Sequence, residues 1–94
     1  MMPKPGKRIK YQLSRHARQE MDRRSIPIEL LESVLMEPQQ VIEQLDGKKV
    51  YQSQMDLGGG KIYLLRTIVI EFAVYALMIT AYRTKKIGKY WRES

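Results

Sequence analysis

The chain has 94 residues but no cysteine, and it has a single histidine. Without cysteine it can form neither a disulfide nor a thiolate nucleophile. A metal site would have to combine His16 with scattered carboxylates, so we expect neither a bound metal nor another cofactor. The first ten residues also lack the apolar core and small-residue cleavage site of a signal peptide, which favours a cytoplasmic location.

An uninterrupted hydrophobic run is missing as well. Residues 62–82 are almost wholly apolar, but Arg66 and Glu71 interrupt them. A charge inside a membrane-spanning helix costs about 2.5 to 3.5 kcal/mol on insertion scales. The β-branched and aromatic residues of this segment favour strands instead. We therefore expect no membrane association.

The charge of +7 is unevenly distributed along the chain. Residues 1–24 carry eight basic residues against two acidic ones, and residues 61–94 carry seven against two. Residues 25–60 reverse this balance, with two basic and six acidic residues. A fold that brings the two ends together would form one basic surface, which would attract phosphates or acidic proteins.

Local patterns predict two helices near the N-terminus. Apolar and polar residues alternate over residues 9–13, which indicates a short strand. Ser14 can then cap a helix over residues 15–24 through its hydroxyl. A second helix begins near Pro27, which a first turn tolerates, and ends before Pro38. Residues 1–10 are expected to form a flexible basic arm.

After Pro38 the pattern changes to that of strands and turns. Asp46-Gly47 predicts a two-residue hairpin turn between strands at residues 41–45 and 48–57, and Gly58 to Gly60 form the next turn. Two further strands are expected over residues 62–70 and 74–83, followed by a short helix over 85–91. The sequence thus predicts one α+β domain over residues 11–94, with two helices on an antiparallel sheet of four to five strands.

His16 is the only candidate for a histidine base. It opens the first helix among arginines, and both these cations and the helix dipole favour the neutral imidazole that a base requires. The alternative is a surface or capping histidine without a catalytic role. Glu20 has the helical spacing to pair with Arg23 or Arg24, and we expect a solvated surface contact.

Two arginines near the C-terminal strands are candidate phosphate ligands. Arg66 shares a sheet face with apolar residues, so its cation needs a partner. This partner is either the carboxylate of Glu71 or of a neighbouring residue, or a phosphate on the open face. Arg83 ends the last strand and begins a basic run. Aromatic rings among these cations suit RNA, because unpaired bases stack on them for about 1 to 3 kcal/mol each. The candidate RNA-binding residues are Lys86, Lys89, Tyr82, Tyr90 and Trp91, of which Tyr90 and Trp91 have an alternative role as anchors of the last helix.

Two motifs resemble the family of unknown function DUF4258. The first comprises Ser14-Arg15-His16-Ala17, Met21 and Arg23-Arg24-x-Ile26; the second comprises Ile79-Thr80-Ala81-Tyr82-Arg83-Thr84 and Ile87-x-Lys89-Tyr90-Trp91. Such proteins are distantly similar to the RelE/ParE and BrnT toxins of type II toxin-antitoxin systems. The resemblance implies helices packed on a curved antiparallel sheet and a short C-terminal helix. The BrnT strand motif is Ile-Ser-Ala-Arg, so this chain has an additional Tyr before Arg83.

The resemblance implies a metal-independent ribonuclease with RNA and a cognate antitoxin as partners. A base would take the proton of a 2′-hydroxyl, which would attack the adjacent phosphorus, while cations stabilise the developing charge. Arg83 and Arg66 would be these cations, Lys86 would hold the backbone, and His16 would be the base, with Glu71 or Tyr82 as substitutes. Two alternatives are a non-catalytic basic module that binds nucleic acid or an acidic protein, and a gyrase-directed toxin of the ParE kind.

Overall fold

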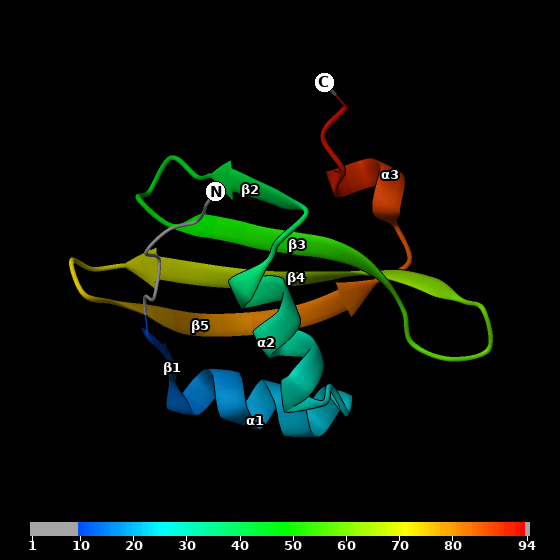
Figure 1. Cartoon of the computed structure of the whole chain (residues 1–94), viewed down its shortest axis with the longest axis horizontal. Coiled ribbons are helices and arrows are strands. Elements are labelled where there is room, and N and C mark those ends of the chain that lie inside the picture. The colour runs from blue at the N-terminus through cyan, green and yellow to red at the C-terminus, as the bar shows by residue number, and fades with distance from the viewer. Residues whose placement is uncertain (1–9, 94) are drawn as a thin grey trace.

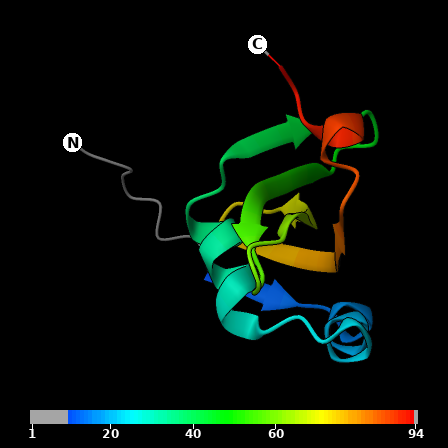
Figure 2. The same ribbon diagram turned by 90° about the vertical axis from the view of Figure 1, so that its right-hand side faces the viewer.

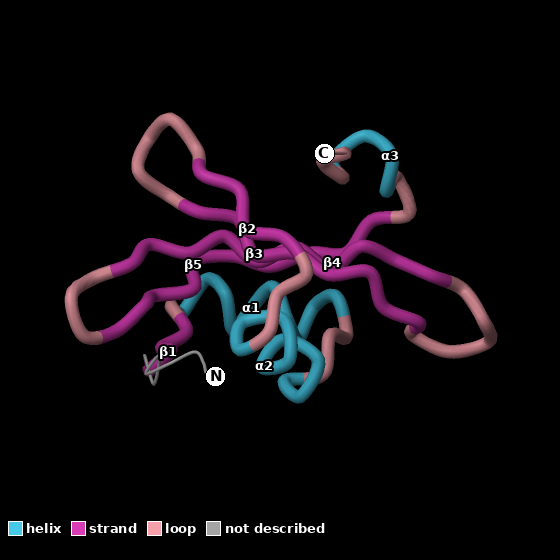
Figure 3. The backbone as a smooth tube through the Cα atoms, turned by 45° about the horizontal axis from the view of Figure 1, so that its top comes forward, coloured by secondary structure: helices cyan, strands magenta, loops and turns pink. Residues whose placement is uncertain are grey.

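A five-stranded sheet separates two long helices from a short C-terminal one (Figure 1). The computed structural model describes residues 10–93. Its elements are β1 (Lys10–Leu13), α1 (Arg15–Arg24), α2 (Ile28–Met36), β2 (Gln40–Glu43), β3 (Lys49–Asp56), β4 (Ile62–Glu71), β5 (Tyr75–Thr84) and α3 (Ile87–Tyr90). The strand order is β1-β5-β4-β3-β2. Figure 3 shows α1 and α2 on one side of this sheet and α3 on the other. The α+β class is therefore confirmed.

The helices begin and end where the local signals place them. The Ser14 hydroxyl accepts a hydrogen bond from the Ala17 amide at 3.0 Å, and Ser25 ends α1 in the left-handed conformation with φ of 55°. Pro27 precedes α2. Apolar residues on both helices pack against β3, β4 and β5 and form the core, which includes Ala17, Met21, Leu31, Val34, Leu35, Leu65, Val69 and Met78.

The first strand pairs differently from the other four. Strands β2 to β5 are antiparallel as expected, whereas β1 pairs in parallel with β5, with Leu13 opposite Met78. The sheet is therefore mixed. The long connection through α1, α2 and three strands allows this parallel pairing, which a hairpin cannot provide. The expected basic arm lies outside the described residues apart from Lys10, which begins β1.

Two local expectations are wrong. The β2–β3 connection is not a two-residue turn, because Glu43 pairs with Lys49 and the Gln44 amide donates to the Lys48 carbonyl at 2.8 Å. Gly47 supplies the positive φ of 87° that this longer loop needs. The last helix is also shorter than expected, because α3 covers only Ile87–Tyr90.

A bulge in β5 reverses which side chains face the helices. Ile68 pairs with Thr80, but Val69 pairs with Met78, so Ile79 has no partner in β4. The carbonyl of Ile79 instead accepts a hydrogen bond from the Ser14 hydroxyl at 3.3 Å. Because one residue is inserted, Met78 before the bulge and residues 81 and 83 after it share the helix-facing side.

Among residues 10–93, no helix combines the length and apolar character needed to cross a membrane.

The end of the sheet from which α3 extends is opposite the hairpin that joins β4 and β5 (Figure 1). In Figure 2, the residues after α3 lead away from the sheet on the side opposite α1. α3 therefore lies on the side of the sheet that α1 and α2 leave open (Figure 3).

Candidate nucleic-acid interface

Exposed cations gather where β5 ends and α3 follows. Arg83, Lys85, Lys86 and Lys89 are all exposed. The ion pairs formed between residues 10 and 93 involve Arg23, Arg24, Lys48 and Lys49, and none of these four C-terminal cations. Their charge is therefore available to an external anion.

Tyrosine rings lie directly beside these cations. Arg83 Cζ is 5.7 Å and Lys85 Nζ is 5.8 Å from the centroid of the Tyr63 ring, and Lys89 Nζ is 5.3 Å from that of Tyr90. We name these residues together the basic end: Tyr63, Arg83, Lys85, Lys86, Lys89 and Tyr90. Tyr63 is not among the residues that the sequence predicts for this site. Its place beside Arg83 depends on strand pairing: Leu65 of β4 pairs with Arg83, and Tyr63 lies two residues before Leu65 on the same face.

Arg66 has an unusual environment on the open face. Its side chain is only 8% exposed. Its Nε donates to Gln52 Oε1 at 2.8 Å and its Nη1 donates to the Tyr82 hydroxyl at 2.6 Å. The Tyr90 ring covers the guanidinium, with Cζ 4.1 Å from the ring centroid. All these partners are neutral residues.

Of the two kinds of partner considered for Arg66, the Glu71 carboxylate is wrong. Glu71 lies at the far end of β4, where it forms an ion pair with Lys49 at 3.0 Å and accepts a hydrogen bond from Tyr51. Burial, the hydrogen bond to Glu71 and the negative charge of that carboxylate raise the pKa of the Tyr51 hydroxyl. These contacts assign Glu71 to the opposite end of the sheet from α3.

The two tyrosines around Arg66 have opposite pKa shifts. Burial raises the pKa of Tyr82, against the effect of the Arg66 hydrogen bond. Burial also acts to raise the pKa of Tyr90, but the Lys89 charge, the hydrogen bond with Tyr82 and the other nearby cations together lower it. The rings meet edge to face with centroids 6.4 Å apart. Of the two hydroxyls, that of Tyr90 therefore has the lower pKa.

The structure does not bring His16, Arg66 and Arg83 together. Arg66 pairs with Tyr82 and Leu65 pairs with Arg83, so the two arginines project from opposite faces of the sheet. His16 is exposed in the first turn of α1. That turn adjoins Met78 and Ile79 through Ser14, whereas the far end of α1 lies near Ala81 through Arg24. Tyr82, Tyr90 and Arg66 do form one cluster, and Lys86 and Lys89 lie next to it in the chain.

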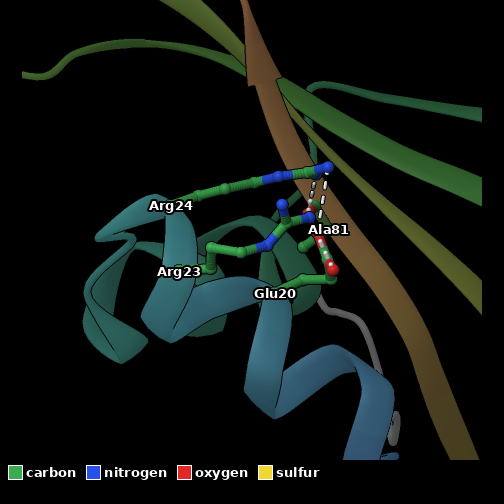
Figure 4. Close-up of polar contacts among 4 residues, drawn as sticks. All are labelled: Glu20, Arg23, Arg24 and Ala81. Carbon is green, nitrogen blue, oxygen red and sulfur yellow. Dashed lines mark hydrogen bonds and ion pairs between the residues drawn. The ribbon is translucent and has the colours of Figure 1, made fainter.

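Glu20 fastens the end of α1 to β5 (Figure 4). Its carboxylate accepts from Arg23 at 2.7 Å and lies 2.9 Å from Arg24 Nη2. Arg24 Nη1 in turn donates to the Ala81 carbonyl at 3.0 Å. Glu20 is 8% exposed, so the expected solvated contact is instead a buried carboxylate held by two arginines. The Arg23 hydrogen bond, followed by the charges of both arginines, lowers the pKa of Glu20 despite its burial.

The pattern of the family described as Domain of unknown function (DUF4258) matches residues 13–83. The match includes the first turn of α1 and both candidate arginines, and it ends before α3. No curated protein and no solved structure matches the chain significantly. Among residues 10–93, no three His, Cys, Asp or Glu side chains are grouped so that they could hold a metal ion.

Proposed function

The chain belongs to the family DUF4258, and we propose that it binds RNA through its basic end. The observation that supports this proposal is the contact between tyrosine rings and cations that form no ion pair among residues 10–93, above all Arg83 and Lys85 beside Tyr63. Phosphates neutralise such cations, and unpaired bases stack on such rings. An acidic protein would use the charges but would not need the rings. RNA is therefore the favoured partner over an acidic protein.

The test is the salt dependence of RNA binding. A labelled single-stranded oligoribonucleotide would be titrated with the full chain between 50 and 200 mM salt, with fluorescence anisotropy as the readout. Arg83→Ala should weaken binding roughly three- to tenfold and reduce the slope of log K against log salt by about 1. Lys48→Ala is the matched control, because Lys48 is basic but lies in the hairpin loop at the other end of the sheet. Equal losses in both variants would contradict a localised site.

A metal-independent ribonuclease of a cytoplasmic toxin-antitoxin system is the second candidate. Its candidate base is Tyr90, whose ring centroid lies 4.1 Å from Arg66 Cζ and 5.3 Å from Lys89 Nζ, because nearby cations lower the pKa and so favour the phenolate that can take the proton of a 2′-hydroxyl. Lys86 and Lys89 would then stabilise the charge on phosphorus oxygens. Tyr90→Phe should abolish cleavage in EDTA while RNA binding persists, since the ring remains. Cleavage that survives this change would reject Tyr90 as the base.

Induced expression in a bacterial host distinguishes the remaining alternatives. A ribonuclease toxin should arrest growth with loss of total RNA, and Arg83→Ala should relieve both effects. A gyrase-directed toxin should arrest growth with intact RNA and impaired supercoiling. Normal growth with confirmed protein would favour the binding module without catalysis, and capture with the intact chain would then identify its nucleic-acid partner. An antitoxin partner should restore growth when the two are expressed together.

A further inference from the structure

We propose that Arg66 is a binding site for a phosphate group and that α3 with residues 91–93 forms a latch that closes this site. The site lies on the open face of the sheet and is distinct from the exposed cations Arg83 and Lys85 on the other face. It shares Tyr90 with the basic end but not Arg83, so Arg83→Ala tests the proposed RNA binding without removing a contact of this site.

The charge of Arg66 is not neutralised within the described residues. The guanidinium is buried, but none of the ion pairs formed between residues 10 and 93 includes it. Gln52 and Tyr82 accept hydrogen bonds from two of its five N–H groups. A buried cation is costly without an anion, and the Tyr90 ring lowers this cost without cancelling the charge. The remaining donors suit a phosphate, which guanidinium groups bind through paired hydrogen bonds.

A chain of hydrogen bonds connects Arg66 to the C-terminal segment. The fully buried Gln52 side chain, which accepts from Arg66, donates to Gln40 Oε1 at 2.8 Å and to the Tyr90 carbonyl at 3.3 Å. Gln40 then holds the backbone of Arg92 from both sides: its Nε2 donates to the Arg92 carbonyl at 2.7 Å, and its Oε1 accepts from the Arg92 amide at 3.1 Å. The Gln40 side chain therefore holds the latch against the sheet.

The latch is weakly packed. None of the four residues of α3 is buried. A cavity of about 530 Å³ lies between β2 and the segment beyond α3, lined by Gln40, Val41, Ile42, Glu43, Arg92 and Glu93. Because few apolar contacts hold this segment, the Gln40 bonds contribute much of its attachment. Opening would move the Tyr90 ring off the guanidinium and let a phosphate take its place.

The experiment follows the Nε–H resonance of Arg66 by NMR in the full chain during titration with inorganic phosphate. The natural protein should show a weak response. Gln40→Ala should bind phosphate at least fivefold more tightly, because loss of the hydrogen bonds from Gln40 to Arg92 raises the population of the open form. Gln54→Ala is the matched control: it is the same substitution on the same sheet face, in the neighbouring strand β3, but the Gln54 side chain makes no hydrogen bond to residues 90–92. It should leave phosphate affinity unchanged.

The outcomes separate the site, the latch and the source of the phosphate. No response of the Arg66 resonance in either the natural protein or Gln40→Ala would overturn the site. Equal tightening in Gln54→Ala would overturn the latch. A parallel titration with a short oligouridylate identifies the source: a response to RNA but not to inorganic phosphate supports a phosphodiester ligand, and the reverse supports a small phosphate. If Arg83→Ala has no effect on RNA binding while the Arg66 response persists, only the proposed function fails.

Discussion

Arg66 and Arg83 are neighbours on adjacent strands, yet they project from opposite faces of the sheet. Arg66 is paired with Tyr82, and Arg83 is paired with Leu65. The Arg66 side chain is buried under α3, whereas the Arg83 side chain is exposed beside Tyr63. In this arrangement the two guanidinium groups cannot clamp one phosphate from the same side. Each arginine therefore requires its own explanation and its own experiment.

The first prediction concerns the energetic role of Arg66. Arg66→Met should change the free energy of unfolding by less than about 1 kcal/mol, because removing an unneutralised buried charge offsets the hydrogen bonds that are lost. Gln52→Leu should cost more, about 2 to 3 kcal/mol, since it removes one of the two acceptors of that buried charge. Urea denaturation of both variants measures the difference. A larger loss in Arg66→Met than in Gln52→Leu would show that the guanidinium stabilises the fold.

A second prediction follows from the lowered pKa of Glu20. The pKa of this carboxyl in the folded chain lies below its ordinary value of 4.5, so its stabilising effect is complete above that value and is lost as the pH falls through the folded-state pKa. The natural protein should therefore lose stability as the pH falls below 4.5, and Glu20→Gln should show a shallower decline. Thermal unfolding across this range tests it, with Glu32→Gln on the exposed side of α2 as the control. Parallel curves for the natural protein and Glu20→Gln would contradict the assignment.

The sequence predicted the helices well because their signals are local. The Ser14 hydroxyl caps α1 by accepting a hydrogen bond from an amide three residues away. Pro27 directly precedes α2, and Pro38 lies two residues after its end. Position in the chain is enough to find such features. The Asp46-Gly47 signal also marked the β2–β3 connection correctly, but it gave the wrong length, because Gly47 needs its positive φ in a loop closed by Gln44 and Lys48.

The candidate site was harder to predict because it depends on contacts distant in sequence. The face that Arg83 occupies is decided by the bulge at Ile79, whose carbonyl is bonded to Ser14, 65 positions away. Regular alternation along β5 cannot reveal this insertion. Likewise, the sequence indicated that Arg66 needs a partner, but a charged one was expected, and the structure supplies the neutral Gln52 from a neighbouring strand.

The third prediction tests the link between the α1 cap and the bulge. Ser14→Ala removes the acceptor for the Ala17 amide and the donor to the Ile79 carbonyl, and it should cost about 1 to 2 kcal/mol of stability. Ser33→Ala is the control, since Ser33 is exposed within α2 and alanine favours helices. Urea denaturation measures both. A loss at Ser14 no larger than that at Ser33 would show that neither bond matters.

The last prediction separates the ring of Tyr63 from its hydroxyl. Under the proposed function, Tyr63 contributes a flat surface beside Arg83 and Lys85, on which an unpaired base stacks. Tyr63→Phe keeps that surface and should leave RNA affinity within about twofold, whereas Tyr63→Leu should weaken it at least fivefold, which corresponds to about 1 kcal/mol. Anisotropy with a single-stranded oligoribonucleotide measures both variants. Tyr75→Leu removes a half-buried ring near the opposite hairpin and serves as the control. If Tyr63→Phe loses as much affinity as Tyr63→Leu, the hydroxyl and not the ring contacts RNA, and base stacking at the basic end is rejected.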